Sequence, residues 1–446
     1  MNAMKVLLSA YACEPNKGGE PGIGWHWGQE VARLGHDVWV LTRANNRDTT
    51  ERASLAVPNL HFVYYDPPHW CAAVKKCGPF LQWYYAVWQL GAYRKALELH
   101  QSEQFDIVHH VTIGVFRHPS FMGRLGIPFI VGPVGGGERT PLRLRMDYGI
   151  SGYLLDTVRD VANVVAKCNP WLRETCGAAS LILVKTPHTG VALPSRYHHK
   201  VRHLIEIGSP GVADFPPPAP LARGVRFLYV GRFLFWKGMQ YGLRAFARLL
   251  RDVPDARLTM VGAGRDDRRW RRLSRALGIS PAVEWSGWIR HAELGALYGS
   301  HDVFLFPSLH DSSGSVVLEA MSYGLPVVCF DLGGPGVLVT RESGIAVQTA
   351  GRSREQLVEA LAEAMKVPIA QPDRLRALQL GALARARELT WASAVRQVYG
   401  EAGVGRVLGR RVPRASAWTA GNDPGAPGGE RTHGVDHSAT PDSRLE

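Results

Sequence analysis

Short apolar runs alternate along the chain with longer segments in which apolar residues recur at helical spacing. In the first half, strand-like runs occupy 5–11, 37–42, 61–65, 106–110 and 128–133, and a helical pattern covers 22–34. In the second half, similar runs occupy 226–231, 258–264, 283–287, 302–308 and 326–330. Strands that alternate with helices are typical of a parallel sheet with helices on both faces. The pattern therefore predicts an α/β protein with two doubly wound parallel sheets.

The two series are separated by a segment, 203–224, that is rich in Pro and Gly. This composition is typical of an interdomain linker, so we place the division near residue 205. From about Leu408 the chain lacks periodicity and is full of Gly, Pro, Ser, Asp and Arg. Such a segment cannot bury enough apolar surface to fold. We predict a first domain over 1–205, a second domain from 206, and a disordered tail over 408–446.

The composition limits the classes of partner that the protein is expected to bind. A net charge of +13 favours polyanions: nucleic acid, phosphorylated substrates or an anionic membrane face. Nucleic acid is not predicted, because no recognition module occurs and aromatics are not interleaved with basic residues as stacking platforms require. The six cysteines form no CxxC pair, which favours reduced thiols in a cytoplasmic protein. No segment reaches the ~18 apolar residues of a membrane span, and the apolar run at the N-terminus is too short for a secretion signal.

Several charged side chains of the second half follow directly after strands, where a doubly wound sheet binds its ligands. Arg232 and Lys237, in VGRFLFWKG, could hold a diphosphate, or could be solvated loop charges. In DSSGSVVLEAMSYG, Asp311 precedes a predicted helix that contains Glu319. The free N–H groups near Ser313–Ser315 would favour an anion, and Glu319 could reach a ribose diol. Gly333-Gly334 follows the next strand as a close-approach loop.

The first half repeats this design. Gly18 and Gly19 follow the first strand and would let backbone N–H groups meet a phosphate, although a plain loop is the alternative. His109 and His110 end a strand. They could be ligand contacts, or they could be core histidines whose hydrogen bonds are satisfied within the protein. Gly135–Gly137, followed by Glu138, indicates close ligand approach or a mobile lid. D-x-D, Walker A, HExxH and GxSxG motifs are absent from the sequence, so metal-borne phosphoryl transfer and serine hydrolysis lack their usual residues.

Taken together, these motifs resemble a known family. VGRFLFWKG, LTMVGAG, SGWIRHAELGALYGSHDVFLFPS, the acid-x7-Glu stretch and the GG loop are similar in order and spacing to retaining GT-B glycosyltransferases of the sucrose-synthase and lipopolysaccharide-mannosyltransferase type, glycosyltransferase family 4. The resemblance covers about residues 4–405. CEPNKGGEPGIGW and GPVGGGE look like a bacterial subgroup that assembles surface polysaccharides. ELTWASAVRQVY, at 388–399, looks like the family's closing helix, so the resemblance implies that 386–407 crosses back and that the second domain covers 206–385.

The resemblance implies two Rossmann-like domains that face each other across a cleft, and a role for each motif. Arg232 and Lys237 would bind the diphosphate of a nucleotide sugar, Glu319 the ribose, and Gly18 and Gly19 would close on the diphosphate. His109 or His110 would contact the sugar. Further nucleotide-sugar contacts are implied at Gly262, Ile289, Ser313, Gly314 and Ser315. Neither a metal nor a cofactor is implied, because two cations and a helix dipole would stabilise the leaving group.

Two departures from the family pattern stand out. Asp311, implied to lie near the donor sugar hydroxyls, is one methylene shorter than the usual Glu. The sequence HHVT replaces the frequent H-x-H, so that the second histidine falls on Val111. The alternatives are a nucleotide-sugar epimerase on the same fold and a non-catalytic polysaccharide-assembly subunit.

The resemblance implies a UDP- or GDP-sugar donor and a glycan or polyprenyl-diphosphate-linked acceptor, used in the cytoplasm at the inner face of the plasma membrane. One stretch, 67–100, gathers Trp, Tyr and Phe beside four cations. This combination suits the interfacial zone of an anionic membrane. The alternative is an ordinary helix that covers the first sheet with its aromatics in the core.

Overall fold

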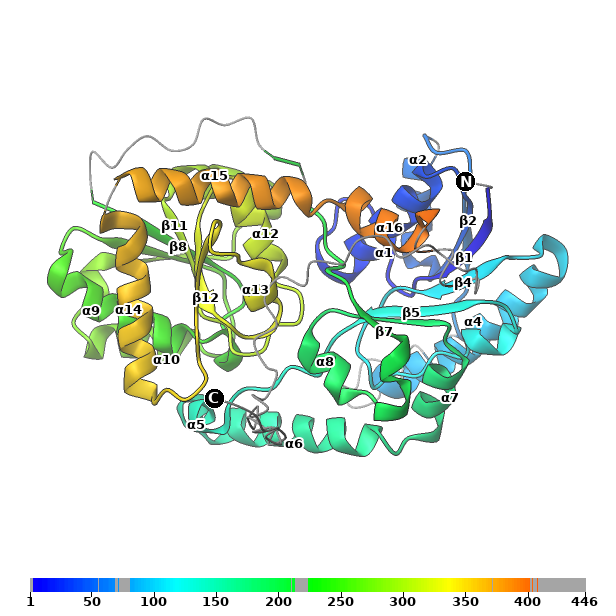
Figure 1. Ribbon diagram of the computed structural model, residues 1–446, viewed down its shortest axis with the longest axis horizontal. Helices are drawn as coiled ribbons and strands as arrows, with labels where there is room; N and C mark the ends of the chain where they lie inside the picture. The colour runs from blue at the N-terminus through cyan, green and yellow to red at the C-terminus, as the bar shows by residue number, and fades with distance from the viewer. Residues whose placement is uncertain are drawn as a thin grey trace, which may run out of the picture.

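The computed structural model of the 446-residue chain describes residues 3–54, 56–68, 71, 81–209, 211–212, 224–370, 372–401, 403 and 407. The predicted tail, 408–446, and most of the predicted linker lie outside these ranges. So do residues 69–70 and 72–80 of the aromatic stretch. Two parallel sheets, each covered by helices, stand side by side in Figure 1.

The first sheet contains seven parallel strands in the order β3-β2-β1-β4-β5-β6-β7. The strands are β1 (Lys5–Ser9), β2 (Asp37–Thr42), β3 (Leu60–Tyr64), β4 (Ile107–His110), β5 (Phe129–Val134), β6 (Leu181–Val184) and β7 (Val201–His203). Its helices include α1 (Gly19–Arg33), α2 (Arg47–Ser54), α4 (Leu81–Glu103), α5 (Leu142–Arg145), α6 (Gly149–Ala166), α7 (Pro170–Ala178) and α8 (Pro187–Ala192). The order reverses beside β1, so the ends of β1 and β4 form the ligand crevice expected of such a sheet.

The second sheet contains six parallel strands in the order β10-β9-β8-β11-β12-β13. They are β8 (Arg226–Val230), β9 (Arg257–Val261), β10 (Val283–Gly287), β11 (Val303–Phe306), β12 (Val327–Phe330) and β13 (Gly344–Val347). The helices include α9 (Met239–Asp252), α10 (Asp267–Ala276), α11 (Leu294–Ser300), α12 (Ser315–Ser322), α13 (Gly333–Leu338), α14 (Arg354–Ala370) and α15 (Pro372–Glu388). The prediction of an α/β fold with two doubly wound parallel sheets is confirmed.

Burial explains why these segments fold as they do. Every residue of β4, β11 and β12 is buried, as expected for strands covered by helices on both faces. Helix α9 turns Met239, Leu243, Phe246 and Leu249 to the sheet, at helical spacing. One hydrophobic cluster joins the second sheet to one face of the first, and another cluster covers the other face of the first sheet.

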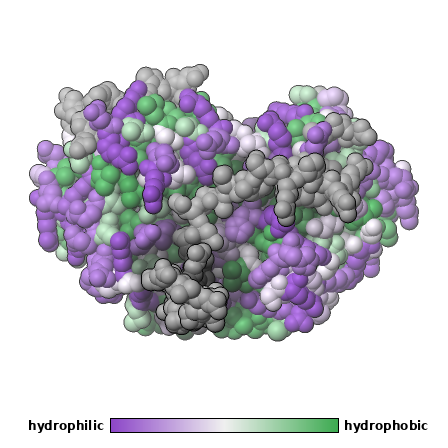
Figure 2. Space-filling model, in the orientation of Figure 1, coloured by the Kyte–Doolittle hydropathy of each residue, from purple (hydrophilic) through white to green (hydrophobic). Residues whose placement is uncertain are grey.

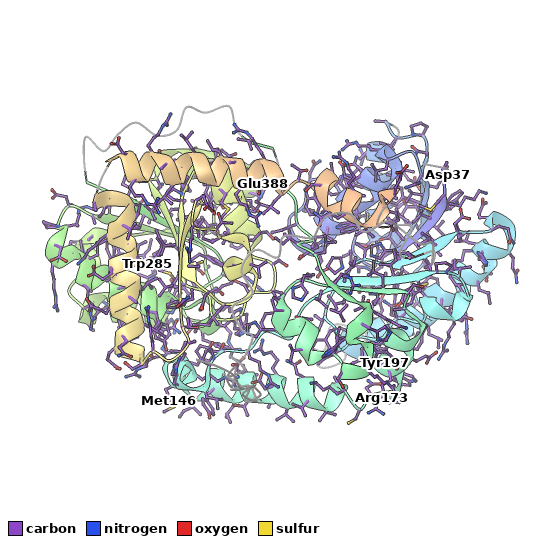
Figure 3. All side chains as sticks on the ribbon, viewed as in Figure 1. Asp37, Met146, Arg173, Tyr197, Trp285 and Glu388 are labelled. Atoms are coloured by element: carbon purple, nitrogen blue, oxygen red, sulfur yellow. The ribbon has the colours of Figure 1, made fainter. Side chains whose placement is uncertain are left out.

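The end of the chain returns to the first sheet. The chain leaves α15 near Glu388, labelled in Figure 3, and continues into α16 (Trp391–Tyr399), which packs against α1. Thr390 and Ser393 form a capping box that starts α16. The ring of Trp391 stacks on that of His26 with centroids 4.6 Å apart. The segment expected to cross back therefore lies beside α1, as Figure 1 shows.

The described part of the aromatic stretch lies in the core. Tyr84, Tyr85 and Trp88 of α4 are buried against the first sheet, and the rings of Tyr85 and Trp88 contact each other and that of Tyr11. These three aromatics therefore fit the alternative of a helix that covers the sheet. Among the described residues, no helix is long and apolar enough to cross a membrane.

Candidate functional site

Loops after β8 and β11 meet at one edge of the second sheet, because neighbouring parallel strands end on the same side. Lys237 lies at the end of a short 3-10 turn, Phe235–Lys237. Its Nζ atom is 2.6 Å from Oδ2 of Asp311 and 5.0 Å from the ring centroid of Phe306. Gly238, with φ of 72°, allows this approach, since a Cβ there would lie 1.8 Å from the carbonyl oxygen of Pro307. Arg232 lies exposed at the end of β8.

The backbone of Asp311 is held by the glycine pair of the next loop. The Gly334 N–H donates to the Asp311 carbonyl over 2.7 Å. A Cβ on Gly333, which has φ of 61°, would lie 2.1 Å from the same oxygen. Close approach between two loops of the protein thus explains these glycines, and it fixes the position of the Lys237–Asp311 pair.

Glu319 lies inside α12, more than one turn beyond Gly314, whose φ of 77° starts that helix. The Tyr298 hydroxyl donates to Glu319 over 3.2 Å, and Nε2 of His291 is 3.6 Å away. Burial, followed by the charge of Glu319, raises the pKa of Tyr298 well above its usual value, so the phenol is a donor at neutral pH. The hydrogen bond to Glu319 raises the pKa of the more exposed His291. The carboxylate is thus oriented from one side and remains partly exposed.

The remaining predicted contacts of the second domain lie near the same sheet edge. Gly262 follows β9 with φ of 134°, and a Cβ there would lie 2.0 Å from the Gly231 carbonyl oxygen. This residue therefore has a packing reason to be glycine. Ile289 follows β10 and packs partly buried against the core. Ser315 is the first residue of α12.

The Gly135–Gly137 loop of the first domain touches the second domain. The Gly136 N–H donates to Oε2 of Glu138 over 2.9 Å and to Oγ of Ser312 over 3.3 Å. The Ser312 hydroxyl donates to Oε2 of the same Glu138 over 2.7 Å. A Cβ on Gly135 would lie 2.7 Å from that of Ser312. The glycines therefore let the two domains approach each other closely in this structure.

A buried ion-pair cluster beside this loop was not predicted from the sequence. Lys185 follows β6, and its Nζ atom lies 2.9 Å from Oε1 of Glu206 and 3.8 Å from Oε1 of Glu20. It also donates to the Ser313 hydroxyl over 3.4 Å, and Ser313 donates to Glu206. Burial alone would lower the pKa of Lys185, but Glu206 and Glu20 outweigh it and raise the pKa. The sequence carried one signal for this cluster, because Lys185 is a charged residue directly after the apolar strand β6.

Glu20 connects the cluster to the glycine loop after β1. Its carboxylate accepts from the Ile113 N–H over 2.8 Å and from the Gly114 N–H over 3.3 Å. Gly18 precedes α1 and Gly19, with φ of 65°, begins it. Among the described residues, and apart from the neighbouring backbone, no heavy atom lies within 4 Å of a Cβ built on either glycine. The loop backbone is therefore open to a ligand at this point.

The two predicted histidines lie deep in the first domain. His109 is fully buried, and its Nε2–H donates to the Gly132 carbonyl over 2.7 Å while Nδ1 accepts from Tyr399 over 2.8 Å. Burial lowers its pKa to about 3. With both nitrogens occupied, His109 matches the alternative of a satisfied core histidine. His110 is also buried, and its Nε2 lies 3.3 Å from the Tyr85 hydroxyl.

His110 differs from His109 in one respect: its Nδ1 atom has no hydrogen-bond partner within the described ranges. Burial, followed by the charge of His118, lowers the pKa of His110 to about 4. His118, half-buried beside the Tyr85 ring, also has its pKa lowered to about 4, by burial and by Arg117. Of the two predicted histidines, His110 alone has a ring nitrogen without a hydrogen bond of normal geometry in the described ranges, although the Thr112 backbone interacts with its ring.

A second polar cluster lies between α6 and the Asp311 loop. Arg159 donates to Nδ1 of His310 over 2.9 Å, so the proton of this ring resides on Nε2, which lies 3.5 Å from Asp156. Asp156 also lies 3.0 Å from Arg159 and 2.9 Å from Arg145. Burial, followed by Arg159, lowers the pKa of His310 well below its usual value, so the ring is neutral. His310 stacks on Trp236, one residue before Lys237.

Metal ligands were not expected from the sequence, and in the described ranges no group of three or more His, Cys, Asp or Glu side chains could hold a metal ion. The metal-independent reaction implied by the resemblance remains a prediction.

Comparisons with known proteins agree with this geometry. Residues 220–377 match the family described as "Glycosyl transferases group 1". D-inositol 3-phosphate glycosyltransferase of Corynebacterium aurimucosum is 30% identical over 179 residues, 38% of this chain and 41% of the relative. Glycogen synthase of Mycobacterium tuberculosis is 30% identical over 211 residues, 44% of this chain and 50% of the relative. The chain thus spans half or less of the length of these relatives.

Solved structures match nearly the whole chain. The lipopolysaccharide outer core galactosyltransferase WaaB has a TM-score of 0.59 at 14% identity, over 91% of this chain and 99% of its own. Sucrose-phosphate synthase from Thermosynechococcus elongatus has a TM-score of 0.56 at 20% identity, over 89% and 97%. Anabaena Alr3699/HepE in complex with UDP has a TM-score of 0.55 at 14% identity, over 89% and 98%. The fold is therefore GT-B, and within the second half of the chain residues 220–377 match the group 1 model.

Proposed function

We propose that this chain is a retaining, metal-independent glycosyltransferase that moves a sugar from a UDP- or GDP-sugar to a glycan or polyprenyl-diphosphate-linked acceptor. The observation that carries the proposal is the Lys237–Asp311 pair, with Arg232 and the start of α12 at the same sheet edge. The group 1 domain and the GT-B fold support a nucleotide-sugar donor, and HepE was solved with UDP. WaaB, by name, acts on the lipopolysaccharide outer core, which supports a surface-polysaccharide acceptor.

The chemistry follows from charge. When the glycosidic bond to the diphosphate breaks, negative charge develops on the leaving phosphate oxygens. Lys237 and Arg232 would stabilise this charge, together with the free N–H groups at the start of α12. Lys237 has three donor hydrogens, so its hydrogen bond to Asp311 fixes the ammonium and leaves donors for phosphate. Asp311 and His110 would contact the donor sugar, and Glu319 the ribose.

Retention requires the acceptor hydroxyl to attack on the face that the diphosphate leaves. The departing phosphate oxygen can accept the proton of that hydroxyl, so no separate protein base is needed. The partly buried contacts among Glu138, Ser312 and Gly136 connect the two domains at this place and would limit the access of water. Exclusion of water protects the activated sugar from hydrolysis.

The test has two stages. A thermal-shift screen of UDP, GDP, ADP and their sugars first identifies the base, and we expect a rise in the unfolding temperature with one of them. The matching donor is then incubated with a polyprenyl-diphosphate-linked glycan, with and without a chelator, and the anomeric configuration of the product is read by NMR. An inverted product, or activity lost with the chelator, would contradict the proposed mechanism. An isomeric nucleotide sugar formed from donor alone would instead indicate an epimerase.

A further inference from the structure

Helix α6 has its polar and apolar sides reversed relative to an ordinary surface helix. The residues that it buries are Gly152, Asp156, Asn163 and Ala166. Its large apolar residues point outward, with exposed fractions from 38% for Tyr153 to 84% for Ile150; the others are Leu154, Leu155, Val158, Val161, Val164 and Val165. A surface helix normally buries its apolar stripe, and monomeric proteins rarely expose a contiguous apolar face of this length. The outward face of α6 therefore needs an apolar environment.

The face continues beyond both ends of the helix. Leu142 and Met146 precede α6 and are 68% and 70% exposed, and Trp171 follows it at 54%. Exposed residues from Met146 to Trp171 include no charged side chain. Figure 2 shows hydrophobic residues along the lower edge of the molecule, where Figure 1 places α6. We call residues 142–171 on this side the α6 face; Met146 and Arg173, labelled in Figure 3, lie near its two ends.

The acids of α6 are turned inward and neutralised. Asp156 lies 2.9 Å from Arg145 and 3.0 Å from Arg159, and Asp160 pairs with the same two arginines. Asn163 donates to the Gly136 carbonyl over 3.1 Å. The polar side of α6 therefore contacts the Gly135–Gly137 loop and, through Arg159, the His310 ring next to Asp311. One helix thus has its polar side at the candidate site and its apolar side at the surface.

Cations flank the α6 face. Arg143 and Arg173 are exposed near its two ends, and Lys167 is partly exposed at the end of the helix. An acid-free apolar face with basic ends is complementary to an anionic lipid surface, where Trp and Tyr also favour the interfacial zone. A second copy of the chain fits less well, because an antiparallel pair of these faces would bring basic ends together.

We propose that the α6 face docks the protein on an anionic membrane surface. The inference rests on the proposed function, because docking would bring the domain junction to the level of a lipid-linked acceptor. It places the contact on α6 rather than on the 67–100 stretch, whose described aromatics Tyr84, Tyr85 and Trp88 are in the core.

The direct test is co-sedimentation of the full chain with vesicles of phosphatidylcholine and phosphatidylglycerol in about equal parts. We expect the protein to pellet at low salt, and Leu154→Gln/Val158→Ser/Val161→Asn to reduce the partition coefficient by at least about tenfold, because apolar burial drives interfacial binding. The matched control is Leu97→Gln/Leu380→Gln, which changes exposed leucines on α4 and α15. This control should pellet like the wild type.

A fluorescent probe locates the contact. Cys168 is the exposed cysteine among those described and lies just beyond α6, whereas Cys13, Cys71, Cys176 and Cys329 are buried. A polarity-sensitive fluorophore on Cys168, in a Cys77→Ser background, should shift to the blue with anionic vesicles and be quenched by lipids that carry a bromine or spin label. The same label placed on Leu97→Cys, in a Cys77→Ser/Cys168→Ser background, should do neither.

The outcomes separate this inference from the proposed function. Wild-type protein that stays in the supernatant with excess anionic vesicles at low salt would overturn the docking proposal. So would a wild-type dimer that the triple substitution splits into monomers while vesicles remain unbound, since the face would then be a protein interface. The thermal shift with nucleoside diphosphate reports on donor binding alone, and the triple variant should keep it.

Discussion

Replacing Lys185 with methionine removes the only cation that the structure places against Glu206 within the described ranges. Methionine has nearly the same length, so packing of the side chain is retained. Both residues are buried, at 8% and 2% exposure, and the pair is 2.9 Å apart. The substitution therefore isolates the effect of the charge, while leaving the Glu206 carboxylate in the domain junction with the Ser313 hydroxyl as a donor.

The expected loss in the free energy of unfolding is about 3–5 kcal/mol, the range for a buried ion pair from which one partner is removed. Glu20, whose Oε1 atom lies 3.8 Å from Nζ of Lys185, loses the same cation. In the variant the carboxylates of Glu20 and Glu206 therefore repel each other without a cation between them. An exposed pair in this protein, such as Lys95–Glu98 at 2.9 Å, should contribute less than about 1 kcal/mol. Lys95→Met is thus the matched control.

Urea unfolding at pH 8 measures the effect. Lys185→Met combined with Glu206→Gln should recover most of the stability at pH 8. A single variant within about 1 kcal/mol of wild type, or a double variant no more stable than the single, would refute the reasoning.

Lys237→Ala and Arg232→Ala should each raise the barrier to transfer by about 2–4 kcal/mol, as loss of comparable charge-stabilising donors does, whereas Lys366→Ala should leave turnover unchanged; rates within a few-fold of wild type would contradict the site. Glu319→Gln should weaken binding of the nucleoside diphosphate without lowering the unfolding temperature, and equal affinity by calorimetry would exclude its role. Truncation after Val407 should leave an active, folded enzyme; an inactive or unfolded product would contradict the predicted tail. The folded-state pKa values of about 3, 4 and 4 for His109, His110 and His118 lie below the unfolded value of about 6.5. The unfolded chain therefore binds protons first as pH falls, and stability should decrease from about pH 7 downward, by about 2 kcal/mol for each histidine at pH 5; a thermal-denaturation series that is flat from pH 7 to 5 would oppose this.

The sequence alone determined the two sheets and most of their strands. Fully buried parallel strands read as short apolar runs between turn residues, so the predicted runs 106–110, 302–308 and 326–330 contain β4, β11 and β12. The placement of Arg232, Lys237 and Asp311 also followed, because loops at the ends of parallel strands share one edge. The strands β6, β7 and β13 were missed, since they span only three or four residues and β7, Val-Arg-His, is mostly polar.

Only the tertiary structure decided what each charged or histidine side chain contacts. His109 and His110 are neighbours in sequence, yet alternation along β4 turns one toward Tyr399 of α16 and the other toward Tyr85 of α4. The partners of Lys185 come from α1 and from the segment after β7, which the sequence separates by well over a hundred positions.

Helix α6 shows most directly what the sequence alone does not determine. Its sequence has an apolar stripe and a polar stripe at helical spacing, which determines a helix and its amphipathic character. Which stripe faces inward depends on what the rest of the fold offers. Here Arg145, His310 and the Gly136 carbonyl supply polar partners on the inner side. The acids and the amide of α6 are therefore satisfied inside, and its valines and leucines face out.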